Sequence, residues 1–427
     1  MKFTKLILVL IVVFNANLLL AQSYLDSLDK MKNEIKDVKK IKITGWSQTQ
    51  YQWTQTPGAK TLDGGDFPVN SNNRFMIRRG RVKIVYTNKL FQSVLQINAT
   101  ERGVNLVDIY GKVTDPWTNS FSFSSGVMNR PFGFEIQQSS SDRETPERSR
   151  FTQLLLPNER DLGALATYEP TKKSKLYGLK IDAGIFNGTG IAVPGTSNFG
   201  AGLTDFDAYK DVIGRIYYKK TSKSNSITYA FGGSYYNGGF VYQNNRVFKS
   251  IELVNNVYEW KIEDTLLNNF KGKKAPRVYY DFEAQFSIKT KLGKSTLRCE
   301  FITGTQSGVV DDSKSPSSLP SKPDTYIRSF NGGYAYLIHR IGTTKHEIAL
   351  KYDFYDPNTK LNAENVSALS AFSRAELKYT MMGFGYNIYL NENVKIMLYY
   401  NHVLNESTNK YVELRDDVFT ARVQYRF

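Results

Sequence analysis

The sequence predicts an all-β protein whose strands form a transmembrane antiparallel barrel. Three observations support this prediction: an export signal at the N-terminus, side chains that alternate between apolar and polar, and connections that alternate between short and long. The chain has 427 residues, of which 41% are hydrophobic and 14% aromatic. One domain can account for this length, because a β-barrel can exceed the usual size of a domain.

The first 22 residues have the properties of a secretory signal peptide. Lys2 and Lys5 precede an unbroken apolar run from Leu6 to Phe14, and Leu20-Ala21-Gln22 is a suitable cleavage site. No later stretch contains 18 or more consecutive apolar residues. If the exported chain enters a membrane, we therefore expect it to do so as a closed barrel.

Residues 23–40 differ from the rest of the chain, because their apolar residues recur at helical spacing. These residues are Leu25, Leu28, Met31, Ile35 and Val38. The pattern indicates a short N-terminal helix. It is either a periplasmic or subunit-interface helix, or a frayed amphipathic leader before the first strand. Residues 41–427 would then form the outer-membrane barrel.

From residue 41 onward, apolar and polar side chains alternate. In the last segment, Phe419, Ala421, Val423, Tyr425 and Phe427 alternate with polar and basic residues. Successive side chains of a strand point to opposite faces, so one face is apolar. A soluble sandwich would also alternate. The segments are however about ten residues long or longer, and aromatic residues lie near their ends, as in strands that cross a bilayer.

Sixteen segments fit this description, an even number that suits a bacterial barrel made from one chain. Short turns alternate with long connections, as expected for periplasmic turns and external loops. Residues 248–253 could add a strand, and a partner within 248–276 would raise the count to 18. The expected strands are 41–53, 73–87, 91–102, 104–114, 119–129, 160–169, 175–187, 209–220, 226–237, 277–291, 294–305, 326–340, 345–356, 375–390, 393–404 and 416–427.

If the apolar face contacts lipid, the polar face of each strand lines the lumen. By this rule, roughly fourteen basic and roughly six acidic side chains point inward. A pore lined by arginine and lysine favours anions, because its positive field concentrates them in a narrow channel.

Residues 130–160 form the third external loop of the expected barrel. The loop mixes arginines with acidic residues and contains Leu154, Leu155 and Leu156 in succession. A fully exposed loop has little reason to contain three adjacent leucines. We therefore expect it to fold into the lumen, where the leucines pack against the wall and the charges narrow the channel. The candidate anion-binding residues are Arg79, Arg81, Lys83, Arg130, Arg143, Arg148, Arg150, Arg160, Arg215 and Arg298.

Four stretches of the chain carry a family resemblance: Asn73–Lys89, Ala99–Trp117, Asn129–Ala164 and Asp417–Phe427. They resemble the phosphate-selective porin O/P family, in its Bacteroidetes branch. The resemblance implies a sixteen-stranded, often trimeric outer-membrane diffusion channel that prefers anions. It also implies that the loop arginines, Arg79 and Arg81 contact the permeating anion.

Together these features predict an outer-membrane porin of a Gram-negative, Bacteroidetes-like cell. We expect a homotrimer in contact with outer-membrane lipid, through which small phosphate-like anions diffuse passively. Two alternatives stay open. One is a general or sugar-permitting porin without anion selectivity. The other is a non-channel barrel that supports a surface or secretion complex.

The sequence indicates neither an enzyme nor a bound cofactor. A single cysteine excludes a disulfide framework and a cysteine-based metal site. His339 and His346 flank a turn, but no carboxylate or thiol is spaced to complete a tetrahedral metal site with them. No nucleophile motif supports hydrolysis. The net charge of +16 is compatible with nucleic-acid binding, but export argues against such a partner.

Overall fold

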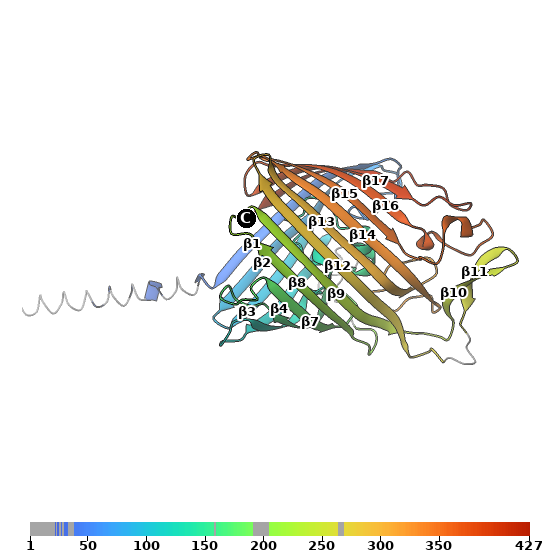
Figure 1. Ribbon diagram of the computed structural model, residues 1–427, viewed down its shortest axis with the longest axis horizontal. Coiled ribbons are helices and arrows are strands. Elements are labelled where there is room, and N and C mark those ends of the chain that lie inside the picture. The colour runs from blue at the N-terminus through green and yellow to red at the C-terminus, as the bar shows by residue number, and fades with distance from the viewer. Residues whose placement is uncertain are drawn as a thin grey trace, which may run out of the picture.

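The computed structural model describes residues 38–427 apart from 158, 191–204 and 264–268, together with residues 22, 24, 27 and 30–32. Within these residues, 18 strands form one sheet, and sixteen of them make a closed antiparallel barrel. The strands of the barrel wall follow one another in chain order and are tilted relative to the long axis of the molecule (Figure 1). The predicted fold class is confirmed.

Each predicted strand is present, with ends that differ by a few residues. The strands of the wall are β1 (Ile41–Thr54), β2 (Asn73–Asn88), β3 (Phe91–Thr100), β4 (Gly103–Thr114), β5 (Phe121–Asn129), β6 (Arg160–Tyr168), β7 (Leu179–Phe186), β8 (Asp211–Thr221), β9 (Ile227–Val241), β12 (Lys274–Thr290), β13 (Gly293–Gly308), β14 (Thr325–Ile341), β15 (His346–Asp356), β16 (Tyr379–Tyr389), β17 (Val394–Asn405) and β18 (Val418–Arg426).

The first and last strands close the barrel. β1 pairs antiparallel with both β2 and β18. At the end of this seam, Gly45 and Phe427 each donate a backbone N–H to the other's carbonyl oxygen, with N–O distances of 3.0 Å. Closure pairs the edge groups that an open sheet would leave free, which a lipid environment requires.

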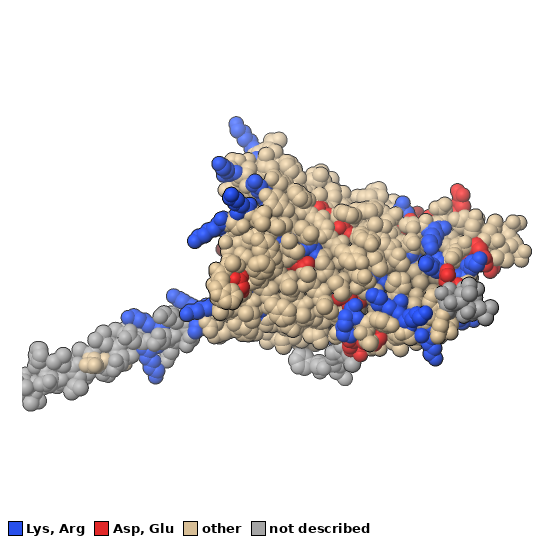
Figure 2. Space-filling model, turned by 60° about the horizontal axis from the view of Figure 1, so that its bottom comes forward, with Lys and Arg blue, Asp and Glu red and all other residues tan. Residues whose placement is uncertain are grey.

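The outer surface of the wall is apolar, as the alternation predicts. On β12, Phe282 and Phe286 are exposed, whereas Glu283 between them is buried inside the barrel. Basic and acidic side chains gather mainly at the two ends of the molecule, and the flank between the ends is largely uncharged (Figure 2). Together with the fold, this apolar flank places the barrel in an outer membrane.

The additional strands at 248–276 belong to an external hairpin and not to the wall. β10 (Val247–Val254) pairs antiparallel with β11 (Val257–Ile262). Asn255 and Asn256 between them have φ values of 50° and 64°, which suit a two-residue hairpin turn. β10 contacts the wall through a short parallel pairing with β14. The wall therefore keeps sixteen strands among the described residues, and the possibility of 18 applies only to the sheet as a whole.

The N-terminal predictions fall largely outside the described residues. Of the expected signal peptide, only Gln22 is described, so this segment stays a prediction. Within the expected leader, residues 24, 27, 30–32 and 38 are described and are helical. No helix among the described residues is long and apolar enough to span a membrane.

The lipid-facing surface of β12 gives a first prediction. Ala284 is exposed and lies on the same face as Phe282 and Phe286. Ala284→Arg should lower the free energy of unfolding by about 2–4 kcal/mol, because it places a charge near the middle of the apolar face. Ala284→Leu is the matched control and should leave stability almost unchanged. Urea titration of the barrel refolded into lipid vesicles measures both, and equal stability of the two variants would contradict the assigned face.

Candidate functional site

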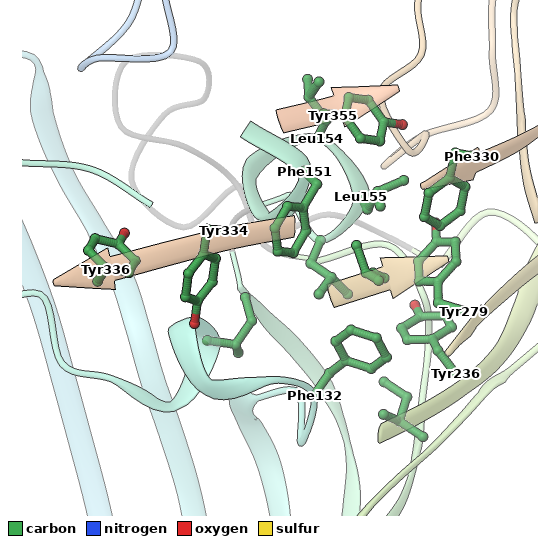
Figure 3. Packing of buried hydrophobic residues seen from close by; sticks show 14 of the residues in the cluster. Phe132, Phe151, Leu154, Leu155, Tyr236, Tyr279, Phe330, Tyr334, Tyr336 and Tyr355 are labelled. Atoms are coloured by element: carbon green, nitrogen blue, oxygen red, sulfur yellow. The ribbon is translucent and has the colours of Figure 1, made fainter. Parts of the chain in front are cut away.

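The third external loop folds into the barrel and packs against one side of the lumen. It contains two short helices, α2 (Phe134–Gln137) and α3 (Arg150–Leu155). Loop residues Phe132, Phe151, Leu154 and Leu155 face aromatic residues of the wall (Figure 3). The ring of Phe151 stacks on that of Tyr334 at a centroid distance of 6.1 Å. The predicted packing of the three leucines is confirmed, since all three are buried in this cluster.

The wall residues in this cluster come from one part of the barrel. Most of them lie on strands β7–β9 and β12–β15. Strands β4–β6 add only Met128 and the partly buried Tyr110 and Leu165, and β1–β3 add none. The loop therefore fills the lumen asymmetrically. The wall residues of the cluster are Met128, Phe186, Ile213, Tyr236, Tyr279, Ile302, Phe330, Tyr334, Tyr336, Ile338, Ala349 and Tyr355.

Glu135 connects the two helical parts of the loop to the wall. Its carboxylate accepts hydrogen bonds from the Ser149 backbone N–H at 2.9 Å, the Thr152 hydroxyl at 2.8 Å and the Tyr336 hydroxyl at 2.6 Å. Burial opposes ionisation of Glu135, but the charge of Lys351 and these hydrogen bonds outweigh it and lower the pKa of the carboxyl. A buried carboxylate with three donors holds the loop in one position.

A cavity of about 340 Å³ lies above the loop, on the side of the long external connections. A second cavity, of about 360 Å³, lies below it and is lined by residues of β1–β7. Arg148 lines both cavities. Its guanidinium forms an ion pair with Glu159 and donates a hydrogen bond to the Glu135 carbonyl oxygen at 2.6 Å. The Arg148–Glu159 contact therefore lies between the outer and the inner cavity.

Four arginines of the described chain surround the carboxylate of Glu147, and we call this arrangement the Glu147 cage. Arg78 Nε is 2.7 Å from Oε1, Arg79 Nη2 is 2.8 Å from Oε2, and Arg422 Nη2 is 3.1 Å from Oε1. Arg143 Nη1 is 3.9 Å from Oε2. One loop carboxylate thus faces arginines from β2, β18 and the loop itself.

The alternation rule does not place Arg78 in the lumen, because Arg78 and Arg79 are adjacent. The structure brings both to Glu147 through a change of register between β1 and β2. Gln48 pairs with Arg79, whereas Thr49 pairs with Ile77, so Arg78 is an extra residue in a bulge. A charged residue at a lipid-facing position of the pattern is the signal that could have indicated this bulge.

The Glu147 cage has a surplus of positive charge. Burial raises the pKa of Glu147, but the charges of Arg78, Arg79 and Arg422 outweigh this effect and hold the pKa well below its usual value. Burial lowers the pKa of Arg143, although a guanidinium in a protein keeps its proton at neutral pH. None of the three side-chain nitrogens of Arg143 has a hydrogen-bond partner among the described residues.

Six of the ten predicted site residues lie at these cavities or in the cage. Arg79 and Arg143 belong to the cage, and Arg148 lies between the cavities. Arg81, Lys83 and Arg160 line the inner cavity. Arg160 Nε is 3.1 Å from Asp108 Oδ1. Arg422 and Arg78 are not among the ten predicted site residues, so the part that each takes in the cage emerges from the structure.

The other four predicted residues lie elsewhere and have partners of their own. Arg130 donates a hydrogen bond to the Pro157 carbonyl oxygen at 2.7 Å, and Arg150 lies over the ring of Tyr379. The remaining two form ion pairs, Arg215 with Glu283 at 2.7 Å and Arg298 with Glu144 at 3.1 Å. The structure therefore does not bring these four arginines to either cavity.

The apolar packing of the loop gives a second prediction. Leu155 is fully buried in the cluster between loop and wall. Leu155→Ala should make local opening of the loop easier by about 2–5 kcal/mol, because it removes packing and leaves a cavity. Hydrogen exchange of the loop amides should accelerate accordingly, while exchange in the wall strands stays unchanged. Leu162→Ala, at a lipid-facing side chain, is the control, and unchanged loop exchange in Leu155→Ala would contradict the packing.

No family model matches the chain, and no curated protein matches it. Solved structures do. The outer membrane channel DcaP of Acinetobacter baumannii is 10% identical, with a TM-score of 0.52 over 91% of this chain and 97% of that chain. Salmonella typhi OmpF, solved with daunomycin, is 12% identical, with a TM-score of 0.50 over 91% of this chain and 97% of that chain. At these identities the likeness shows the fold alone, and that fold is the outer-membrane porin barrel.

Proposed function

We propose that the protein is an outer-membrane channel through which small anions diffuse in preference to cations. The observation that carries this proposal is the surplus of basic side chains in the cavities on both sides of the third loop. Among the described lining residues, the outer cavity has five basic and two acidic side chains, and the inner cavity has six and two. The basic ones are Arg78, Arg79, Arg102, Arg148 and Lys314 outside, and Arg81, Lys83, Lys112, Arg148, Arg160 and Lys180 inside.

Part of this charge is not neutralised. Arg81, Lys83 and Lys112 line the inner cavity, and none of them forms an ion pair with a described residue. Unpaired cations beside water in a narrow, low-dielectric passage attract anions and repel cations. A sixteen-stranded barrel is wide enough for an aqueous channel, which the loop then restricts.

The family resemblance narrows the proposal to phosphate-like anions. Arginine presents forked donors that match two oxygens of a phosphate or carboxylate, and lysine adds a compact charge. Both types occur in the inner cavity, at Arg81, Lys83 and Lys112. Glu147 and Glu159 offset some of the charge in the outer cavity, so we expect moderate anion preference. The homotrimer implied by the resemblance stays a prediction.

One observation favours the non-channel alternative. The Arg148–Glu159 ion pair lies between the outer and inner cavities, and a barrel held closed at this contact would not conduct. The external hairpin β10–β11 packs on a separate apolar cluster around Leu361, Phe372 and Leu377, which would suit a docking role. The absence of current from correctly folded protein in planar bilayers would support this alternative.

Reversal potentials in a gradient of potassium chloride, and then of potassium phosphate, test the anion preference. We expect a potential of the sign produced by anion permeation. Removing two unpaired lysines (Lys83→Gln with Lys112→Gln) should lower the anion-to-cation permeability ratio several-fold. The reason is that a charge about 7 Å from a permeating ion contributes roughly 0.6 kcal/mol even in water.

The control removes two lysines from exposed positions on the short turns, Lys223→Gln with Lys291→Gln. This variant changes the net charge by the same amount and should keep the permeability ratio of the unmodified protein. A cation-preferring or unselective current from the unmodified channel would remove the proposed function.

A further inference from the structure

We propose that the Glu147 cage is a carboxylate-binding site, that Glu147 is its built-in ligand, and that a permeating carboxylate can take its place. This inference rests on the proposed anion channel and assigns a substrate class to one point of its path. It goes beyond a general electrostatic preference, because it identifies a discrete site that the loop itself occupies.

The contacts of Glu147 are those of a bound carboxylate. Arg78 donates from Nε to Oε1 at 2.7 Å and from Nη2 to Oε2 at 2.9 Å, which is the paired geometry of a guanidinium with a carboxylate. Arg79 also contacts both oxygens, at 3.3 Å and 2.8 Å. Arg422 is the third arginine to donate, from Nη2 to Oε1 at 3.1 Å. Each carboxylate oxygen therefore receives at least two guanidinium donors.

The other acceptors of the cage are neutral. Arg79 donates to the Gln48 side chain at 3.1 Å, and Arg422 donates to the Gln50 side chain at 2.8 Å and to the Pro146 carbonyl oxygen at 2.9 Å. Amide and carbonyl oxygens satisfy guanidinium donors without cancelling their charge. Burying several cations around one anion is unfavourable in free energy, and it becomes more unfavourable when that anion leaves. The cage therefore needs an anion at the position of Glu147.

Arg143 supplies donors that Glu147 does not use. Its side chain is 3% exposed, and all three of its guanidinium nitrogens lack a hydrogen-bond partner among the described residues. Nη1 lies 3.9 Å from Glu147 Oε2, so the group adjoins the carboxylate without bonding to it. An unsatisfied buried guanidinium is unfavourable, and an oxyanion seated slightly closer would satisfy it. Arg143 thus indicates unused binding capacity in the cage.

A ligand can reach the cage from the outer cavity. Arg78, Arg79 and Glu147 line that cavity, and the side chain of Arg78 is 27% exposed. Glu147 lies between helices α2 and α3, outside regular structure, whereas α3 is anchored by the apolar cluster. The Glu147 side chain can therefore rotate towards Arg102 and Lys314 in the outer cavity while the rest of the loop stays packed.

Chemical rescue tests the assignment. Glu147→Ala removes the side-chain carboxylate and leaves space that acetate, with its methyl and carboxylate groups, can fill. In sodium chloride, heat should unfold this variant, and so shift its electrophoretic mobility, at a lower temperature than it does the unmodified protein. Sodium acetate at equal ionic strength should raise that temperature again by at least about 2 °C, because a ligand that binds only the folded state stabilises it.

Glu147→Leu is the matched control, because it removes the same charge but fills the space, so acetate should give no rescue. Arg143→Ala combined with Glu147→Ala should need a several-fold higher acetate concentration for the same rescue. If Glu147→Ala does not fold, Glu147→Gln serves in its place. In that variant, acetate should block the single-channel chloride current saturably, and at a several-fold lower concentration than in the unmodified channel, where Glu147 competes for the cage.

Three results would overturn the assignment: no rise in the transition temperature of Glu147→Ala when acetate replaces chloride, rescue of Glu147→Leu, or stronger rescue by inorganic phosphate than by acetate. The last would assign the cage to tetrahedral oxyanions. The rescue experiment measures thermal stability and not ion conduction, so it tests the carboxylate site independently of the proposed anion channel. Acetate-specific rescue with an unselective channel would remove the proposed function and keep the carboxylate site, and the reverse outcome would remove only the site.

Discussion

The packing of the third loop against the inner wall is the interaction on which the functional features of the barrel depend. Loop residues such as Phe132, Phe151 and Leu155 bury their side chains against aromatic residues of β9, β12, β14 and β15. Burial of this much apolar surface draws the loop to one side of the lumen. Polar residues of β1–β6 are left facing the cavities. The packing of the loop against one side of the wall thus divides the lumen into an apolar, filled half and a polar half that faces the cavities.

The same packing determines the electrostatics of the passage. Because the loop is held inside, its acidic residues reach arginines of the wall that would otherwise face water. Glu147 neutralises part of the charge of Arg78, Arg79 and Arg422, and Glu144 forms an ion pair with Arg298. Paired charges that are removed from water are stabilised mainly by each other. The position of the loop therefore decides which cations stay available to a permeating ion and which do not.

Ion pairs also explain why a count of inward-facing charges overstates the anion-binding surface. Arg215 and Arg298 point inward as alternation predicts, but each forms an ion pair with a glutamate, Arg215 with Glu283 and Arg298 with Glu144. Lys83 and Lys112 point inward as well and line a cavity without an ion-pair partner among the described residues. The direction of a side chain depends on the period of a strand, whereas its availability depends on what lies opposite in space.

The sequence by itself determined the strands, the lipid-facing side and the presence of an apolar inserted loop. The physical reason is that a period of two and a run of three leucines are local patterns, and a lipid environment leaves few folds that satisfy the backbone. Tertiary structure alone decided the inward position of Arg78, the grouping of arginines around Glu147 and the placement of β10–β11 outside the wall. These features depend on the register between strands and on contacts between distant segments, such as Glu147 with Arg422. A local pattern of apolar and polar residues specifies neither of these.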